Sequence, residues 1–172
     1  AALGYAEESG IPYGIGFIKN RYIGRTFILP TQKERERAVH IKLNVLEAAV
    51  KGKRVVLVDD SIVRGTTSIQ ITKMLRDAGA TEVHLRISSP PFINPCYFGT
   101  DIDSKDKLIA CRMSLEEIRR TLDVDTLGYL SIEHCAQIAR TTTGCEFCMG
   151  CFTGKYPIDV PEEKPCDKFS QK

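Results

Sequence analysis

The sequence has almost no net charge, no long apolar run and no tryptophan. Its 24 basic and 22 acidic residues leave a formal charge of +2, so no large positive field attracts nucleic acid or an anionic membrane. No apolar run reaches the roughly 18 residues that a membrane-spanning helix needs, and the first ten residues lack the basic and apolar regions of a signal peptide. We therefore expect a cytoplasmic protein with reduced thiols and with neither a nucleic-acid nor a membrane partner.

What is present is the composition of one soluble domain. The 172 residues are 42% hydrophobic and 27% charged, which fits a single packed core better than a disordered or fibrous chain. Residue 1 is an alanine that opens directly into a helical pattern, so we expect the chain to begin partway through a longer polypeptide. Seven cysteines are an odd number and indicate a metal or redox site.

Apolar periodicity predicts strands and helices in alternation. The run Val55–Val58 has the composition of a strand covered on both faces, and Val83, Leu85 and Ile87 alternate with polar residues as in a half-buried strand. With short links between the elements, this order predicts an α/β fold with an open, mostly parallel sheet. The other expected elements are a strand at 13–18 and helices at 2–8, at 39–50, at 71–78, after the S-x-x-E capping box at Ser114 and after Ser131.

The last 32 residues show neither a helical nor a strand period. From Thr141 to Lys172 the chain carries cysteines, glycines and prolines. A tail of this length must be held by something other than its own core. We therefore predict one α/β domain over residues 1–140 and a Cys-rich tail over residues 141–172 that packs on it.

The segment Val55 to Ser68, VVLVDDSIVRGTTS, predicts an anion site. Asp59 and Asp60 come at the carboxyl end of a buried strand, where open α/β sheets bind ligands. Gly65 allows close backbone approach, and the start of the following helix with its hydroxyls (Thr66, Thr67 and Ser68) favours a phosphate. The two carboxylates would repel that phosphate unless they bound sugar hydroxyls and Mg²⁺. The Asp-Asp pair alone also occurs in Walker B strands and phosphoryl-acceptor sites.

A basic segment precedes this region. Residues 19–37 hold six basic and two acidic side chains, a net charge of +4 in a chain whose total is +2. By itself such a run is typical of a solvated surface loop. Beside a phosphate motif, Lys19, Arg21 and Arg25 become candidates for closing over a polyphosphate and expelling water.

VVLVDDSIVRGTTS resembles the phosphoribosyl pyrophosphate (PRPP) motif of type I phosphoribosyltransferases. Together with KNRYIGRTFI at 19–28 and CFTGKYP at 151–157, it resembles the glutamine PRPP amidotransferase family, over residues 1–157. The resemblance implies the type I phosphoribosyltransferase fold and the first step of purine synthesis, in which ammonia derived from glutamine displaces pyrophosphate from PRPP to give 5-phosphoribosylamine.

The resemblance also implies roles for residues. Asp59 and Asp60 would contact the ribose and Mg²⁺, and a flexible loop from Lys19 to roughly Leu43, with Lys19 and Arg25 as catalytic residues, would fold over PRPP. The 5′-phosphate would be wrapped by the segment that holds Ser61, Arg64, Gly65, Thr66, Thr67 and Ser68.

Cysteines at close spacing form a second candidate site. Cys145, Cys148 and Cys151 follow one another at x2 spacing, and Cys96 adds a thiol from a distant turn. Such thiols bind Zn²⁺ or an iron–sulfur cluster, and the spacing alone does not choose. A zinc ribbon would want a second C-x2-C motif in place of one remote ligand, so a cluster is the better geometric guess. The alternative is a group of redox-active or unligated thiols.

The resemblance implies a [4Fe-4S] cluster whose ligands match Cys96, Cys148 and Cys151, with a fourth cysteine upstream of Ala1. Cys145 has no ligand role in the family pattern, although it could substitute for a ligand. The remaining thiols are interpreted as bystanders: Cys111, Cys135 and Cys166. The family also implies a glutaminase domain and a pyrophosphate-loop segment before Ala1, a homo-oligomer (a tetramer), and activity of this chain that is ammonia-dependent at best.

Two other functions remain open at this point. A type I phosphoribosyltransferase that joins a nucleobase to PRPP would carry the same phosphate motif but would not need the cysteine tail. A non-catalytic PRPP-sensing regulator would keep the phosphate loop, although the retained KNRYIGRTFI segment argues against it. His40 and His84 are interpreted as surface residues, since no His, Cys or Ser arrangement for covalent catalysis accompanies the phosphate motif.

Overall fold

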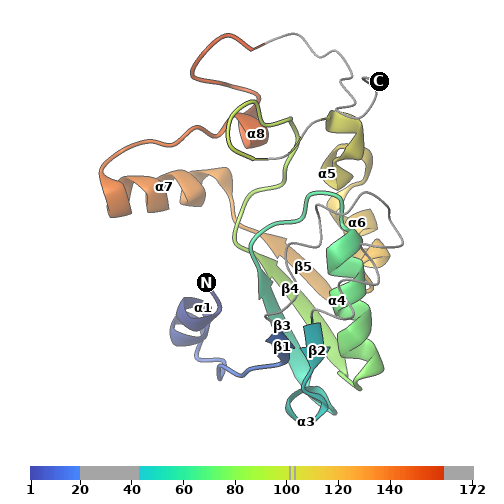
Figure 1. Cartoon of the computed structure of the whole chain (residues 1–172). Coiled ribbons are helices and arrows are strands. Elements are labelled where there is room, and N and C mark those ends of the chain that lie inside the picture. The colour runs from blue at the N-terminus through green and yellow to red at the C-terminus, as the bar shows by residue number, and fades with distance from the viewer. Residues whose placement is uncertain (20–42, 101, 103, 161–172) are drawn as a thin grey trace. The chain divides into compact units, whose positions relative to one another are not determined.

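The computed structural model describes residues 1–19, 43–100, 102 and 104–160 (Figure 1). Among these residues, we find no helix with the length and apolar character to cross a bilayer. The elements in chain order are α1 (Ala2–Ser9), β1 (Phe17–Lys19), β2 (Leu43–Val45), α3 (Glu47–Val50), β3 (Arg54–Asp59), α4 (Thr66–Asp77), β4 (Glu82–Ile87), a 3-10 helix (Lys105–Lys107), α5 (Ile109–Arg112), α6 (Leu115–Thr121), β5 (Thr126–Tyr129), α7 (Ile132–Thr143) and α8 (Gly150–Thr153).

Strands β3, β4 and β5 form a parallel sheet in that order, and α4 connects β3 to β4. Along β4, Val83 and Leu85 are fully buried while the alternating His84 and Arg86 are only partly buried, as the period of two predicts. The predicted open α/β sheet is therefore confirmed. Strand β5 was not expected, because its four residues are too few to show a period and include Gly128.

The chain forms two compact units, each with its own buried residues. The first unit holds the described residues within 1–59, 65–86 and 119–127, and its buried side chains include Leu75, Leu85 and Leu122. The second holds the described residues within 60–64, 87–118 and 128–160, and contains a cluster of Phe92, Ile102 and Leu108.

The helix expected over 39–50 is wrong in its described part. Leu43–Val45 forms strand β2, which pairs antiparallel with β1, and only Glu47–Val50 is helical, with Val50 buried. The Leu46 N–H donates to the Gly16 carbonyl at 2.8 Å, which extends the contact between the two segments. Strand pairing thus overrides the helical spacing of the apolar residues. The strand expected at 13–18 lies at Phe17–Lys19 instead, since only these residues face β2.

Two helix starts agree with their capping signals. The Ser114 N–H donates to Glu117 Oε2 at 2.7 Å and the Glu117 N–H donates to Ser114 Oγ at 3.4 Å, which is the reciprocal capping box at the start of α6. At the start of α7, Ser131 Oγ accepts from the His134 N–H at 3.1 Å. The predicted helices after Ser114 and Ser131 are confirmed.

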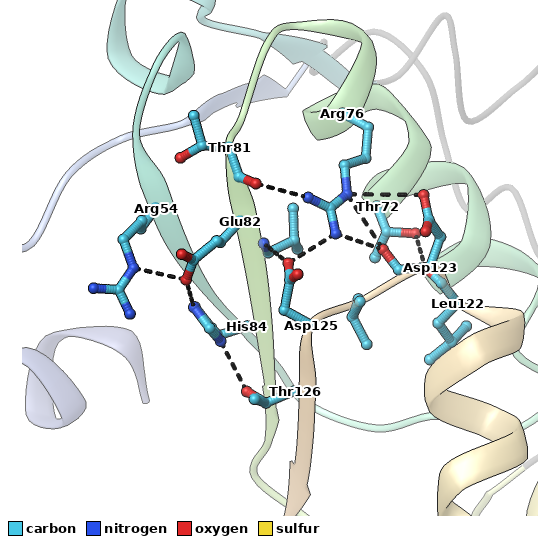
Figure 2. Close-up of polar contacts among 12 residues, drawn as sticks. Arg54, Thr72, Arg76, Thr81, Glu82, His84, Leu122, Asp123, Asp125 and Thr126 are labelled. Atoms are coloured by element: carbon cyan, nitrogen blue, oxygen red, sulfur yellow. Dashed lines mark hydrogen bonds and ion pairs between the residues drawn. The ribbon is translucent and has the colours of Figure 1, made fainter.

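Arg76, near the end of α4, ties the starts of β4 and β5 together within the first unit (Figure 2). Its Nη2 lies 2.7 Å from Asp125 Oδ2, and the same oxygen accepts from the Val83 N–H at 2.7 Å. Arg76 also donates to the carbonyls of Thr81 and Asp123 at 3.2 Å each. The Val83 N–H, followed by the Arg76 guanidinium, holds the pKa of the Asp125 carboxyl below its usual value, against the opposing effect of burial.

We expect Asp125→Asn to lower the free energy of unfolding by about 1 kcal/mol, because it weakens two charge-assisted hydrogen bonds in a partly exposed site. Since the folded pKa of Asp125 lies below 3.8, this contribution is present above pH 3.8 and fades as the pH falls through the folded value. Denaturant unfolding at several pH values measures both effects. The control is Asp159→Asn, which removes the same charge from an exposed residue outside the Arg76 contacts.

Candidate functional site

The end of β3 and the start of α4 both lie in the first unit. Asp59 is the last residue of β3 and is half-buried. Gly65 precedes α4 with a φ of 84°, a left-handed conformation that a side chain would strain. The first intrahelical hydrogen bond runs from the Ile69 N–H to the Gly65 carbonyl at 2.9 Å. The N–H groups of the preceding turn therefore point out of the helix end, where they favour an anion.

The hydroxyls of this first turn differ in exposure. Thr67 is exposed and Thr66 is partly exposed, whereas Ser68 is only 4% exposed. Of the three hydroxyls predicted to contact the phosphate from this turn, those of Thr66 and Thr67 are thus accessible. The Ser68 side chain is buried, so Ser68 can donate to an anion only through its backbone N–H.

Residues 60–64 belong to the second unit and are fixed there by burial. Ile62 is 1% exposed, and the Val63 carbonyl accepts from the Ile109 N–H at 2.9 Å. Ser61 Oγ donates to Asp60 Oδ1 at 3.0 Å, and Asp60 itself is exposed. Ile62 and Val63 therefore anchor residues 60–64, a role that the sequence motif did not indicate.

Lys19 lies at the end of the small antiparallel ladder. It is exposed and pairs with Leu43, so the two ends of the predicted loop over PRPP lie side by side. Arg21, Arg25 and His40 lie outside the described residues, and their assigned positions stay predictions. His84 is on β4 as expected, but its side chain is only 15% exposed and bridges Glu82 Oε2 at 2.8 Å and Thr126 Oγ1 at 2.9 Å (Figure 2).

The second unit brings Cys96 and Cys151 to one apolar cluster. Both pack against Phe92, Ile102 and Leu108, although they lie far apart in the sequence. Burial, followed by the neighbouring Cys96, raises the pKa of the Cys151 thiol to about 11, and Cys148 also contributes. Cys96 and Cys148 therefore each lie close enough to Cys151 to influence its thiol. Within the described part of the chain, however, no three His, Cys, Asp or Glu side chains stand in the arrangement of a metal site.

Backbone N–H groups surround the Cys96 sulfur. The Thr100 N–H donates to Cys96 Sγ at 3.4 Å. Burial alone would raise the pKa of this thiol, but hydrogen bonds from the backbone of Phe98, Thr100 and Gly99 outweigh it and lower the pKa. Such N–H···S contacts stabilise a thiolate, which is the form that binds metals and clusters. The sequence carried no signal for this loop.

The remaining described thiols have other surroundings. Cys111 is exposed and its Sγ donates to the Ile93 carbonyl at 3.3 Å, while Cys145 is exposed. Cys135, on α7, is half-buried and lines a cavity of about 340 Å³ together with Cys148. Cys166 lies outside the described residues.

Curated relatives match nearly the whole chain. Amidophosphoribosyltransferase of Archaeoglobus fulgidus is 56% identical over 95% of this chain, and that of Bacillus subtilis is 54% identical over the same share. These matches span 36% and 35% of the two relatives, so the chain covers about a third of their length. No family model matches the chain.

Solved structures agree with these relatives. The glutamine PRPP amidotransferase from B. subtilis complexed with ADP and GMP matches with a TM-score of 0.79 and 54% identity, over 94% of this chain and 36% of that one. A structure described as the allosteric regulatory enzyme of purine biosynthesis matches with a TM-score of 0.78 and 53% identity, over 94% and 35%.

Proposed function

Because this chain is homologous to the amidophosphoribosyltransferases over 95% of its length, we propose that it is the phosphoribosyltransferase part of such an enzyme. In the proposed reaction, ammonia attacks C1 of PRPP, the bond to pyrophosphate breaks with inversion, and 5-phosphoribosylamine forms. We assign residues 1–140 to this part and residues 141–172 to a tail packed on it.

The observation that carries the proposal is the connection from β3 to α4. It places the Asp59 carboxylate at the end of a parallel strand and a left-handed glycine before a helix whose first amides are available to an anion. We assign the ribose hydroxyls and Mg²⁺ to Asp59 and Asp60. The 5′-phosphate is assigned to Ser61, Arg64, Gly65, Thr66, Thr67 and Ser68, the last through its backbone because its side chain is buried.

These residues act by positioning and by charge. Glycosyl transfer from PRPP passes through a cationic sugar, so the site needs the ring held in place and the leaving pyrophosphate neutralised. When bound, Mg²⁺ supplies positive charge beside the pyrophosphate. We assign Lys19 and Arg25 to the same task, because their positive charge attracts the anion and because Lys19, where their segment begins, pairs with Leu43, where it ends.

We further propose a [4Fe-4S] cluster held by Cys96, Cys148 and Cys151, with a fourth cysteine from outside this chain. The donor set fits such a group because it consists of thiols alone, two of which share one apolar cluster and one of which receives backbone N–H donors. When bound, the cluster would supply a covalent link between the segments that carry its ligands. Cys145 keeps the role of a possible substitute ligand.

The wider assembly is also part of the proposal. We propose that a glutaminase domain on the same polypeptide supplies the ammonia. The protein forms a homo-oligomer, a tetramer in the family pattern, and is located in the cytoplasm. The relatives extend well beyond the third of their length that this chain matches, which leaves room for such a domain.

The test is pyrophosphate release by the complete protein from PRPP, with ammonium as the nitrogen source and Mg²⁺ present. We expect release that rises with the concentration of free ammonia and is unchanged by added nucleobases. Release that requires a nucleobase would favour a base-specific phosphoribosyltransferase. PRPP binding with release at the background rate would favour a PRPP-sensing regulator.

A further inference from the structure

Two segments of the second unit that are distant in the sequence contact each other beside the candidate thiols: the turn before Cys96 and the segment that carries Cys151. The Cys151 carbonyl accepts hydrogen bonds from the N–H groups of both Ile93 and Asn94, each at 3.0 Å. The rings of Phe92 and Phe152 pack at a centroid distance of 4.8 Å. These contacts join the turn before Cys96 to helix α8.

Tyr156 also joins these two segments, next to Cys96. Its hydroxyl donates to the Pro95 carbonyl at 2.6 Å, across 61 positions of sequence. Its ring meets the ring of Tyr97 edge to face, with centroids 5.1 Å apart. Tyr156 therefore contacts the residue on each side of Cys96.

Gly150 provides the space that the Tyr156 ring occupies. A β-carbon built on Gly150 would lie 2.2 Å from Cδ1 and 2.3 Å from Cε1 of that ring. Contacts this short force the ring to move, because it is a rigid group held at its far end by the Pro95 carbonyl. Gly150 lies between Cys148 and Cys151, so the ring packs directly on the C-x2-C segment.

We propose that Tyr156 is a positioning residue, which with Gly150 fixes the turn carrying Cys96 against the Cys148–Cys151 segment and so holds together the two segments that carry the candidate ligands. This inference rests on the proposed cluster. Tyr156 is not itself a ligand: its hydroxyl is engaged with the Pro95 carbonyl, and its effect on the thiols passes through Pro95 and Gly150. Holding the two segments together lowers the conformational entropy that binding the cluster would otherwise cost.

The experiment uses the complete protein, prepared without oxygen, as wild type and as four variants: Gly150→Ala, Tyr156→Phe, Tyr156→Ala and Gly150→Ala/Tyr156→Ala. Iron and sulfide per chain and the rate at which a chelator bleaches the visible absorbance are measured. Tyr156→Phe keeps the ring and loses one hydrogen bond, so we expect bleaching roughly 2- to 10-fold faster. Gly150→Ala displaces the ring and should act more strongly.

The double variant distinguishes positioning from general damage. If Gly150 matters only because of the ring, adding Gly150→Ala to Tyr156→Ala should change the bleaching rate little, a non-additivity that independent sites do not show. Matched controls are Gly4→Ala and Tyr13→Phe. A β-carbon at Gly4 would meet nothing within 4 Å, and Tyr13 is exposed. Both controls should behave as wild type.

A second readout needs no cluster. In the iron-free protein, a bifunctional thiol reagent should join Cys96 to Cys151, identified by mass spectrometry of the linked peptides, and Gly150→Ala and Tyr156→Ala should lower the yield several-fold. Unchanged yield and unchanged bleaching in these variants would overturn the positioning role. A wild type that never contains iron, with a yield that falls in the variants, would contradict the cluster and support the positioning of the thiols.

Discussion

Asp59→Asn and Asp60→Asn should each weaken Mg²⁺-dependent PRPP binding by about 10- to 100-fold, the range expected for losing hydrogen bonds that involve a charged group. Asparagine keeps the shape of aspartate and one of its oxygens, but it loses the negative charge that Mg²⁺ prefers. The double variant should bind PRPP no better in Mg²⁺ than in a chelator. Titration calorimetry of the complete protein, with and without Mg²⁺, measures the affinities.

The control for this pair is Asp77→Asn. Asp77 is exposed and ends α4, the helix that begins at the proposed phosphate site, so the change removes the same charge from the opposite end of that helix. Its affinity for PRPP should match wild type. Wild-type affinity in both Asp59→Asn and Asp60→Asn would mean that the ribose and Mg²⁺ are bound elsewhere.

Cys151→Ser should remove the cluster altogether, with iron and sulfide falling to background and the brown colour lost. A serine hydroxyl is a poor ligand for iron compared with a thiolate, and Cys151 is the half-buried thiol that packs on Phe92, Ile102 and Leu108 beside Cys96. Cys96→Ser should have the same effect. Metal analysis and visible spectra of anaerobically prepared complete protein measure the result.

Two other cysteines sharpen this test. Cys111→Ser changes an exposed thiol outside the ligand set, so full iron content and colour are expected. Cys145→Ser should also leave the cluster intact, and a loss of iron there would make Cys145 the ligand in place of a neighbour. Full iron content in Cys151→Ser, or a colourless wild type with stoichiometric zinc, would contradict the cluster assignment.

The sequence predicted those parts of the fold whose signals are local. The strand ending at Asp59, the glycine before α4 and the capping box of Ser114 and Glu117 all lie within a few residues of the pattern that indicated them. The helix expected over 39–50 failed because the apolar residues there also suit a strand, and the decision came from pairing with Phe17–Lys19, which is distant in the sequence.

In the candidate cysteine site, too, the local features were predictable from the sequence and the long-range contacts were not. Spacing singled out Cys145, Cys148 and Cys151, with Cys96 as a thiol from a distant turn, because clustered cysteines are visible in any sequence. The hydrogen bond from Tyr156 to the Pro95 carbonyl and the close fit of its ring on Gly150 are long-range contacts that no periodicity records. The β5 strand was missed for a related reason, since its four residues become a strand only beside β4.

The pairing of Lys19 with Leu43 has a consequence for how the protein can vary. The ladder of β1 and β2 holds both ends of the intervening segment together. The pairing of the two strands therefore offsets the entropic cost of closing that loop. Each doubling of loop length then costs only about 0.6 kcal/mol. Insertions and deletions between these two residues should therefore be tolerated by the fold, which lets the length of the segment evolve separately from the scaffold that anchors it.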